Sequence, residues 1–80
     1  MDRPLSEIEV GRTGRIIQFT DNIIAGKLMT MGVLPGSEVK VVRKAPFKGG
    51  LYLKIDGGNM VLRESEAETI ILNLIDQENI

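Results

Sequence analysis

Apolar and polar residues alternate along several short stretches of the chain, which is typical of strands that bury one face. In EVKVVRK (38–44) and LYLKI (51–55), aliphatic residues recur at every second position. Three further segments are rich in β-branched and aliphatic residues: RIIQF (15–19), NMVLR (59–63) and TIILNLI (69–75). We therefore predict five short strands.

The connection at 56–59 reads Asp-Gly-Gly-Asn, and these residue types adopt positive φ more readily than others. It predicts a tight hairpin between 51–55 and 59–63. The preceding segment APFKGG (45–50) is expected to be a loop.

One segment, 21–31, has the spacing of a helix instead of a strand. Asp21 or Thr20 is placed to cap its N-terminus, and Gly32 to end it in a left-handed conformation. Residues 34–37 (LPGS) then have proline and glycine at the centre of a type II turn. The helix face expected to meet the core carries Ile24, Leu28 and Met31.

Two Ser-x-x-Glu patterns, at 6–9 and 65–68, are typical of capping boxes and predict single helical turns. Leu5 and Val10 flank the first box at the positions of a hydrophobic staple.

The order of elements is therefore strand, helix, three strands, helical turn and strand. Closing such short strands into a barrel protects their edges. We predict a mainly β fold: a small SH3-like, five-stranded barrel with a helix inserted between strands 1 and 2. Helical turns precede the first and last strands. The chain is expected to form one domain over 1–80, with a core over about 5–75 and a polar tail at 76–80.

Composition excludes several classes of function. The 80 residues include no Cys and no His, so thiolate, imidazole and disulfide chemistry is absent. A net charge of −1 argues against a nucleic-acid binder, and no apolar run is long enough to span a membrane. The N-terminus lacks a secretory core, so we expect a cytoplasmic protein. With only carboxylates and lysines for chemistry, we expect no enzyme.

Two groups of residues are candidate sites. Glu64 and Glu68 lie four positions apart, so their oxygens share one face of a turn where a divalent cation such as Fe(II) could bind. The alternative is that acidic residues only stabilise the start of this turn. The second group combines basic and aromatic residues, as protein contacts do: Arg43, Lys44, Phe47, Lys48, Tyr52, Lys54 and Arg63. Its alternative is a set of solvated strand faces.

Met29 lies off the apolar stripe of the predicted helix. It either faces solvent as a partner contact or packs against the N-terminal turn.

The order of motifs resembles the FeoA family, the ferrous iron transport protein A type of SH3-like domain. The segment LMTMGVLPGSEV (28–39) has the family pattern L-x-x-[LM]-G-[LV]-x-P-G-x-x-V. The remaining motifs are LSEI (5–8), GRI (14–16), AP (45–46) and LRESEAETI (62–70), so the resemblance covers about residues 5–74.

The resemblance implies a small cytosolic accessory of ferrous iron transport, a non-enzymatic module that docks on the membrane GTPase transporter FeoB. The residues expected to carry the contact are Lys27, Met29, Arg43, Phe47, Tyr52 and Arg63. The alternative is a metal sensor related to the C-terminal SH3-like domain of iron-dependent repressors, binding Fe(II) or another divalent metal weakly. No cofactor is expected to be required. An open strand edge would also let the chain associate weakly with itself.

Overall fold

The structure, a computed structural model, describes residues 2–75 and contains six strands, two short helices and two 3₁₀ turns. The strands are β1 (Asp2–Pro4), β2 (Thr13–Phe19), β3 (Glu38–Lys44), β4 (Leu51–Ile55), β5 (Gly58–Leu62) and β6 (Ile70–Leu74). The helices are α1 (Asn22–Thr30) and α2 (Glu64–Ala67), and the 3₁₀ turns are η1 (Leu5–Glu7) and η2 (Pro46–Lys48).

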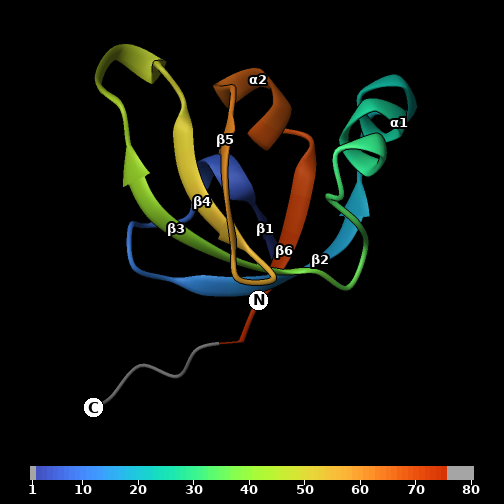
Figure 1. Cartoon of the computed structure of the whole chain (residues 1–80), viewed down its shortest axis with the longest axis horizontal. Helices are drawn as coiled ribbons and strands as arrows, with labels where there is room; N and C mark the ends of the chain where they lie inside the picture. Colours follow the sequence, from blue (N-terminus) through green and yellow to red (C-terminus); the bar gives the residue numbers. More distant parts are fainter. Residues whose placement is uncertain (1, 76–80) are drawn as a thin grey trace.

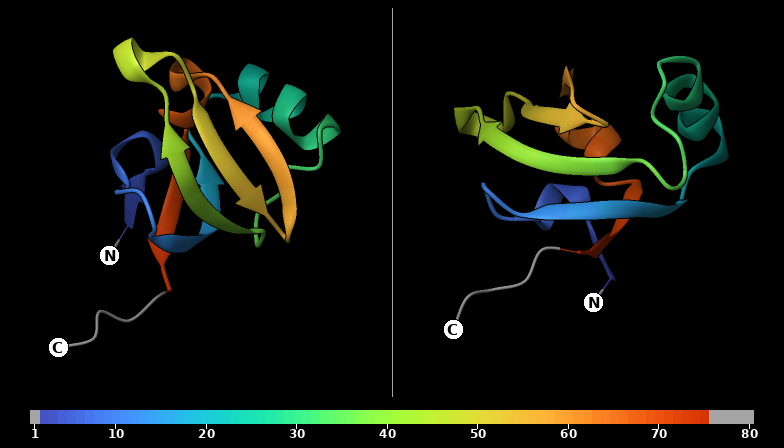
Figure 2. Two further views of the ribbon diagram at one scale, coloured as in Figure 1. Left: turned by 60° about the vertical axis from the view of Figure 1, so that its left-hand side comes forward. Right: turned by 60° about the horizontal axis from the view of Figure 1, so that its bottom comes forward.

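All six strands form one antiparallel sheet in the order β1-β6-β2-β3-β4-β5 (Figure 1). The sheet curves strongly, so that β3 and β4 lie over β2 across the core (Figure 2). It does not close, because its end strands β1 and β5 pair with one neighbour each. The mainly β, SH3-like prediction is confirmed. The predicted five strands are all present, and β1 is an additional edge strand.

The core forms where the alternating strand faces meet α1 and η1. Its fully buried side chains are Leu5, Ile8, Ile16, Leu28, Val33, Val39, Val41, Leu51, Leu53, Leu62, Ile70 and Leu72. Burying this many aliphatic side chains, at about 1.5–3 kcal/mol each, is the main stabilisation available to a chain of this size.

Local signals placed the helix and the turns correctly. The Asp21 carboxylate caps α1 by accepting hydrogen bonds from the backbone N–H groups of Ile23 and Ile24, both at 2.9 Å. Gly32 has φ 89°, a conformation that glycine adopts without steric cost. The Ser37 N–H donates to the Leu34 carbonyl at 3.0 Å, which closes the predicted turn.

The apolar stripe of α1 differs from the prediction. Ala25 and Leu28 are buried and Ile24 is half-buried, but Met31 is 41% exposed. The helix ends at Thr30, so Met31 lies on its C-cap and no longer follows the helical period. The prediction that Met31 faces the core was therefore wrong.

The predicted capping boxes were also wrong in detail. Only a 3₁₀ turn forms at Leu5–Glu7, with no side-chain cap, and Val10 is 55% exposed and so not part of a staple. In α2 the capping carboxylate is Glu66, whose Oε1 accepts a hydrogen bond from the Arg63 N–H at 2.9 Å. Both turns are too short to determine by themselves which residues begin and end them, so packing against the core determines this.

No helix within residues 2–75 is long and apolar enough to cross a membrane. The polar tail predicted at 76–80 lies outside the described residues.

Candidate partner-binding surface

A β-bulge shapes the outer face of β3. Val41 pairs with Leu53 and Arg43 with Tyr52, so Val42 is an extra residue on β3. Val42 is exposed next to the buried Val41, as the alternation from Val39 and Val41 requires, and the bulge places Arg43 opposite the exposed Tyr52 on the same outer face.

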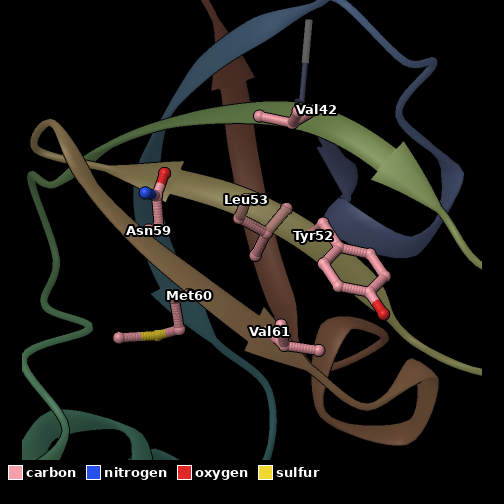
Figure 3. A pocket seen from close by; sticks show the side chains of 6 residues that line it. All are labelled: Val42, Tyr52, Leu53, Asn59, Met60 and Val61. Carbon is pink, nitrogen blue, oxygen red and sulfur yellow. The ribbon is translucent and has the colours of Figure 1, made fainter.

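A shallow hollow of about 330 Å³ lies beside this bulge. Its lining comes from three adjacent strands (Figure 3): Val42 from β3, Tyr52 and Leu53 from β4, and Asn59, Met60 and Val61 from β5. Tyr52 pairs directly with Val61 across β4 and β5, and both side chains are exposed. The hollow is thus mainly apolar and open to solvent. Sequence reasoning did not place Val42, Met60 or Val61 in a site.

The guanidinium of Arg43 lies over the Tyr52 ring, 4.3 Å from its centroid. This is a cation–π contact, and it fixes a positive charge at the rim of the hollow. The contact follows from the bulge, which places Arg43 opposite Tyr52 in the register.

Phe47 is 100% exposed at the centre of η2. Its backbone is left-handed, with φ 58°, and Lys48 follows with φ 55°. Two consecutive non-glycine residues in this region are unusual and cost free energy. The loop is closed at its base by the Ala45 N–H, which donates to the Gly50 carbonyl at 2.9 Å. The loop therefore holds a large apolar ring in solvent next to a basic side chain.

Lys27 and the backbone of Arg63 both bond to Glu66, at a different place between α1 and α2. The Lys27 Nζ lies 2.8 Å from Oε2 of Glu66, whose other oxygen binds the Arg63 N–H. These two hydrogen bonds lower the pKa of the Glu66 carboxyl, with the Lys27 bond as the larger cause. Glu66 is buried, and sequence reasoning missed it because its partner Lys27 is 39 positions away.

Met29 is 42% exposed on α1, which agrees with the solvent-facing alternative for this residue. The structure therefore distributes the six predicted contact residues over two regions. Arg43, Phe47 and Tyr52 lie along β3, η2 and β4, whereas Lys27, Met29 and Arg63 lie on or beside the helices.

The predicted metal candidates lie at the two ends of α2, Glu64 as its first residue and Glu68 as its C-cap. Glu64 is half-buried and Glu68 is exposed, and the Glu68 N–H donates to the Glu64 carbonyl at 3.0 Å. No group of three Asp, Glu, His or Cys side chains within residues 2–75 is arranged to hold a metal ion. Among the described residues, these two glutamates remain a pair without a third ligand.

The sequence pattern of the FeoA domain family matches residues 3–74. The chain belongs to the FeoA domain family. No curated protein sequence matches it closely enough to add further detail.

Two solved FeoA structures show how far the likeness extends. A FeoA-like protein from Clostridium acetobutylicum is 26% identical with a TM-score of 0.88, covering 99% of this chain and 93% of that one. The FeoA of Stenotrophomonas maltophilia, complexed with zinc and described as an SH3 domain protein, is 28% identical with a TM-score of 0.72. That match covers 91% of this chain and 89% of the other.

A manganese-dependent transcriptional repressor in complex with manganese is also similar, with a TM-score of 0.85 at 22% identity. The match covers 92% of this chain but 37% of the repressor. At this identity the likeness concerns the fold alone.

Proposed function

We propose that the chain is a cytoplasmic, non-enzymatic accessory of ferrous iron transport that docks on the cytosolic portion of a FeoB-like membrane GTPase and modulates Fe(II) uptake. Membership of the FeoA family supports the accessory role. The observation that carries the docking step is Phe47, fully exposed on a left-handed backbone in the connection between β3 and β4, the strands that bear Arg43 and Tyr52. Exposed aromatic side chains and arginines are typical of the centres of protein interfaces.

The proposed contact residues are Lys27, Met29, Arg43, Phe47, Tyr52 and Arg63. Phe47 and Met29 are the clearest to test, because their truncation removes exposed atoms and no described hydrogen bond. Lys27 is less clean, since its loss also removes the ion pair with Glu66.

The test is a calorimetric titration of the FeoB cytosolic domain with the wild-type chain, Phe47→Ala and Met29→Ala. Truncating an aromatic residue at the centre of an interface costs about 1.4 kcal/mol or more, so Phe47→Ala should weaken binding by at least about 10-fold. The matched control is Ile23→Ala on α1, which removes an apolar side chain that is 87% exposed and lies outside the proposed contacts. If Phe47→Ala and Met29→Ala both bind like the wild type, the proposed surface is wrong.

A second candidate is weak binding of a divalent metal such as Fe(II). It is favoured by the zinc complex of the Stenotrophomonas maltophilia FeoA. Glu64 and Glu68 are the candidate ligands, with solvent completing the coordination. Anaerobic calorimetry with Fe(II) tests it, with Glu64→Gln and Glu68→Gln as variants. Absence of heat up to millimolar Fe(II) would rule this candidate out.

A further inference from the structure

The two edges of the open sheet differ in their protection. Natural edge strands are kept from pairing by shortness, charge and proline. The β1 edge has all three, because it is only Asp2–Pro4, with two charged residues and a proline. The β5 edge (Gly58–Leu62, sequence GNMVL) is five residues long and contains neither a charge nor a proline. The fold therefore blocks one edge and leaves the other available.

The register of the hairpin identifies the available backbone groups on β5. Ile55 and Gly58 close the two-residue turn, and hydrogen-bonded pairs alternate along an antiparallel ladder. Met60 and Leu62 therefore bond to β4, while the N–H and C=O groups of Asn59 and Val61 point away from it. Among residues 2–75 these outward groups have no hydrogen-bond partner.

The backbone of Arg63, the residue that follows β5, agrees with this register. The N–H of Arg63 also points away from β4, and it donates to Glu66 Oε1 at 2.9 Å. The carbonyl of Arg63 accepts from the N–H groups of Glu66 and Ala67. The open part of the edge is therefore limited to Asn59 and Val61, directly beside the apolar hollow.

Charge decides which occupant fits. Residues 38–62, which run from β3 to the end of β5, contain five basic and two acidic residues, although the whole chain carries −1. A second copy adding to β5 would bring two such basic regions together. An acidic segment would instead lie near Lys54, which pairs with Asn59 one strand inward from the edge.

We propose that β5 is a docking strand, to which an extended acidic segment of a partner protein adds as an antiparallel strand through the backbone of Asn59 and Val61. An apolar side chain of the segment lies opposite Val61 and covers the hollow beside Tyr52. An acidic side chain two positions away lies opposite Asn59, towards Lys54. This mode of recognition takes affinity from the backbone and specificity from alternate side chains. It goes beyond the proposed function, because it names the chemistry of a ligand whichever protein supplies it.

The probe is an acetylated and amidated heptapeptide with a central valine, a glutamate two positions to either side, and threonine elsewhere. NMR titration of the ¹⁵N-labelled chain should shift the amides of Asn59 and Val61. Hydrogen exchange at these two amides should slow by about 10-fold at saturation, because each N–H gains an acceptor. Replacing the glutamates with lysines should weaken binding by about 10-fold through like-charge repulsion.

Two modified peptides separate strand addition from a simple surface contact. N-methylation of the valine and glutamates removes the donors that face β5 and should abolish binding. N-methylation of the two threonines that flank the valine modifies outward-facing groups and should leave binding within about twofold if strands pair in this register.

Variants of the chain give the complementary test. Val61→Pro removes one outward donor without removing a β4 hydrogen bond, and should abolish peptide binding. Because proline also restricts φ, Val61→Thr provides a second variant that keeps the backbone, adds no charge and loses part of the apolar contact, and it should weaken peptide binding. The folds of both are checked from their ¹⁵N spectra.

Three results would overturn the proposal. One is absence of binding at millimolar peptide, and another is a set of shifts confined to residues away from β5. The third is concentration-dependent protection of Asn59 and Val61 in the chain alone, which would make a second copy the occupant.

Discussion

The Nζ atom of Lys27 lies 2.8 Å from Oε2 of Glu66 and ties α1 to α2 across the chain. The Glu66 side chain is buried while that of Lys27 is 58% exposed, so the pair is anchored by the carboxylate. The other oxygen of Glu66 caps α2 through the Arg63 N–H. The Glu66 side chain therefore stabilises both the start of α2 and its contact with α1.

The first prediction concerns acid stability. The pKa of Glu66 is lowered by its hydrogen bonds to Lys27 and Arg63, so its contribution to stability is complete above the ordinary glutamate pKa of about 4.3. As the pH falls through the lowered pKa of the folded state, that contribution is lost. Glu66→Gln should lower the free energy of unfolding by about 1–2 kcal/mol at neutral pH, and by less at pH 3.

Urea unfolding at both pH values measures this difference. The matched control is Glu68→Gln, two residues away and exposed, whose effect should stay within about 0.5 kcal/mol. A Glu66→Gln effect that is the same at neutral pH and at pH 3 would contradict the assigned role of the ionised carboxylate.

The second prediction concerns Gly14, which lies on β2 between β3 and β6. A Cβ at this position would lie 3.0 Å from the Asn73 carbonyl oxygen and 3.1 Å from the Leu72 Cβ. Because the β6 backbone cannot move away cheaply, Gly14→Ala should destabilise the chain by about 1–3 kcal/mol. Gly26→Ala in α1 meets nothing within 4 Å and should stabilise it by about 0.5–1 kcal/mol. Thermal unfolding of both variants tests the pair, and equal effects would argue against the close β2–β6 approach.

Features set by neighbouring residues were predictable from the sequence. The Asp21 cap, the turn at Gly32 and the hairpin at 56–59 each depend on residues that are adjacent in the chain. The strand β1 was missed, because Asp2-Arg3-Pro4 has no alternating pattern and becomes a strand by pairing with β6. The prediction of five strands therefore missed only β1, which forms because it pairs with β6 and not because of its own sequence pattern.

In the candidate surface too, contacts between residues close in sequence were predictable and contacts between distant residues were not. Arg43 and Tyr52 are in contact because β3 and β4 pair through a short connection, and Phe47 lies in that connection. Their role in binding a partner stays a prediction. The hollow's β5 side and the Lys27–Glu66 pair were not predicted, because they depend on strand register and on a contact across 39 positions.

The third prediction tests the contact between Arg43 and Tyr52. Tyr52 is the only tyrosine and the chain has no tryptophan, so its fluorescence follows unfolding without interference. Arg43→Gln removes the charge above the ring and should cost about 0.5–1 kcal/mol. Tyr52→Phe keeps the aromatic ring under the guanidinium, so the contribution of this contact to stability should not change. A double-mutant cycle of Arg43→Gln with Tyr52→Leu, followed by circular dichroism, should give a coupling of about 0.5 kcal/mol. A coupling of zero would mean that the arrangement contributes nothing to stability.

The last prediction concerns the conformation of Phe47. Its ring is fully exposed, so Phe47→Ala removes no buried contact and should change stability by less than about 0.5 kcal/mol. Its φ of 58° costs free energy in any residue with a Cβ, so Phe47→Gly should raise the free energy of unfolding by about 0.5–1 kcal/mol. Such a gain, combined with weaker binding to the FeoB cytosolic domain, would mean that stability is given up to present the ring. If Phe47→Gly is instead less stable than Phe47→Ala, the left-handed backbone is not a source of strain.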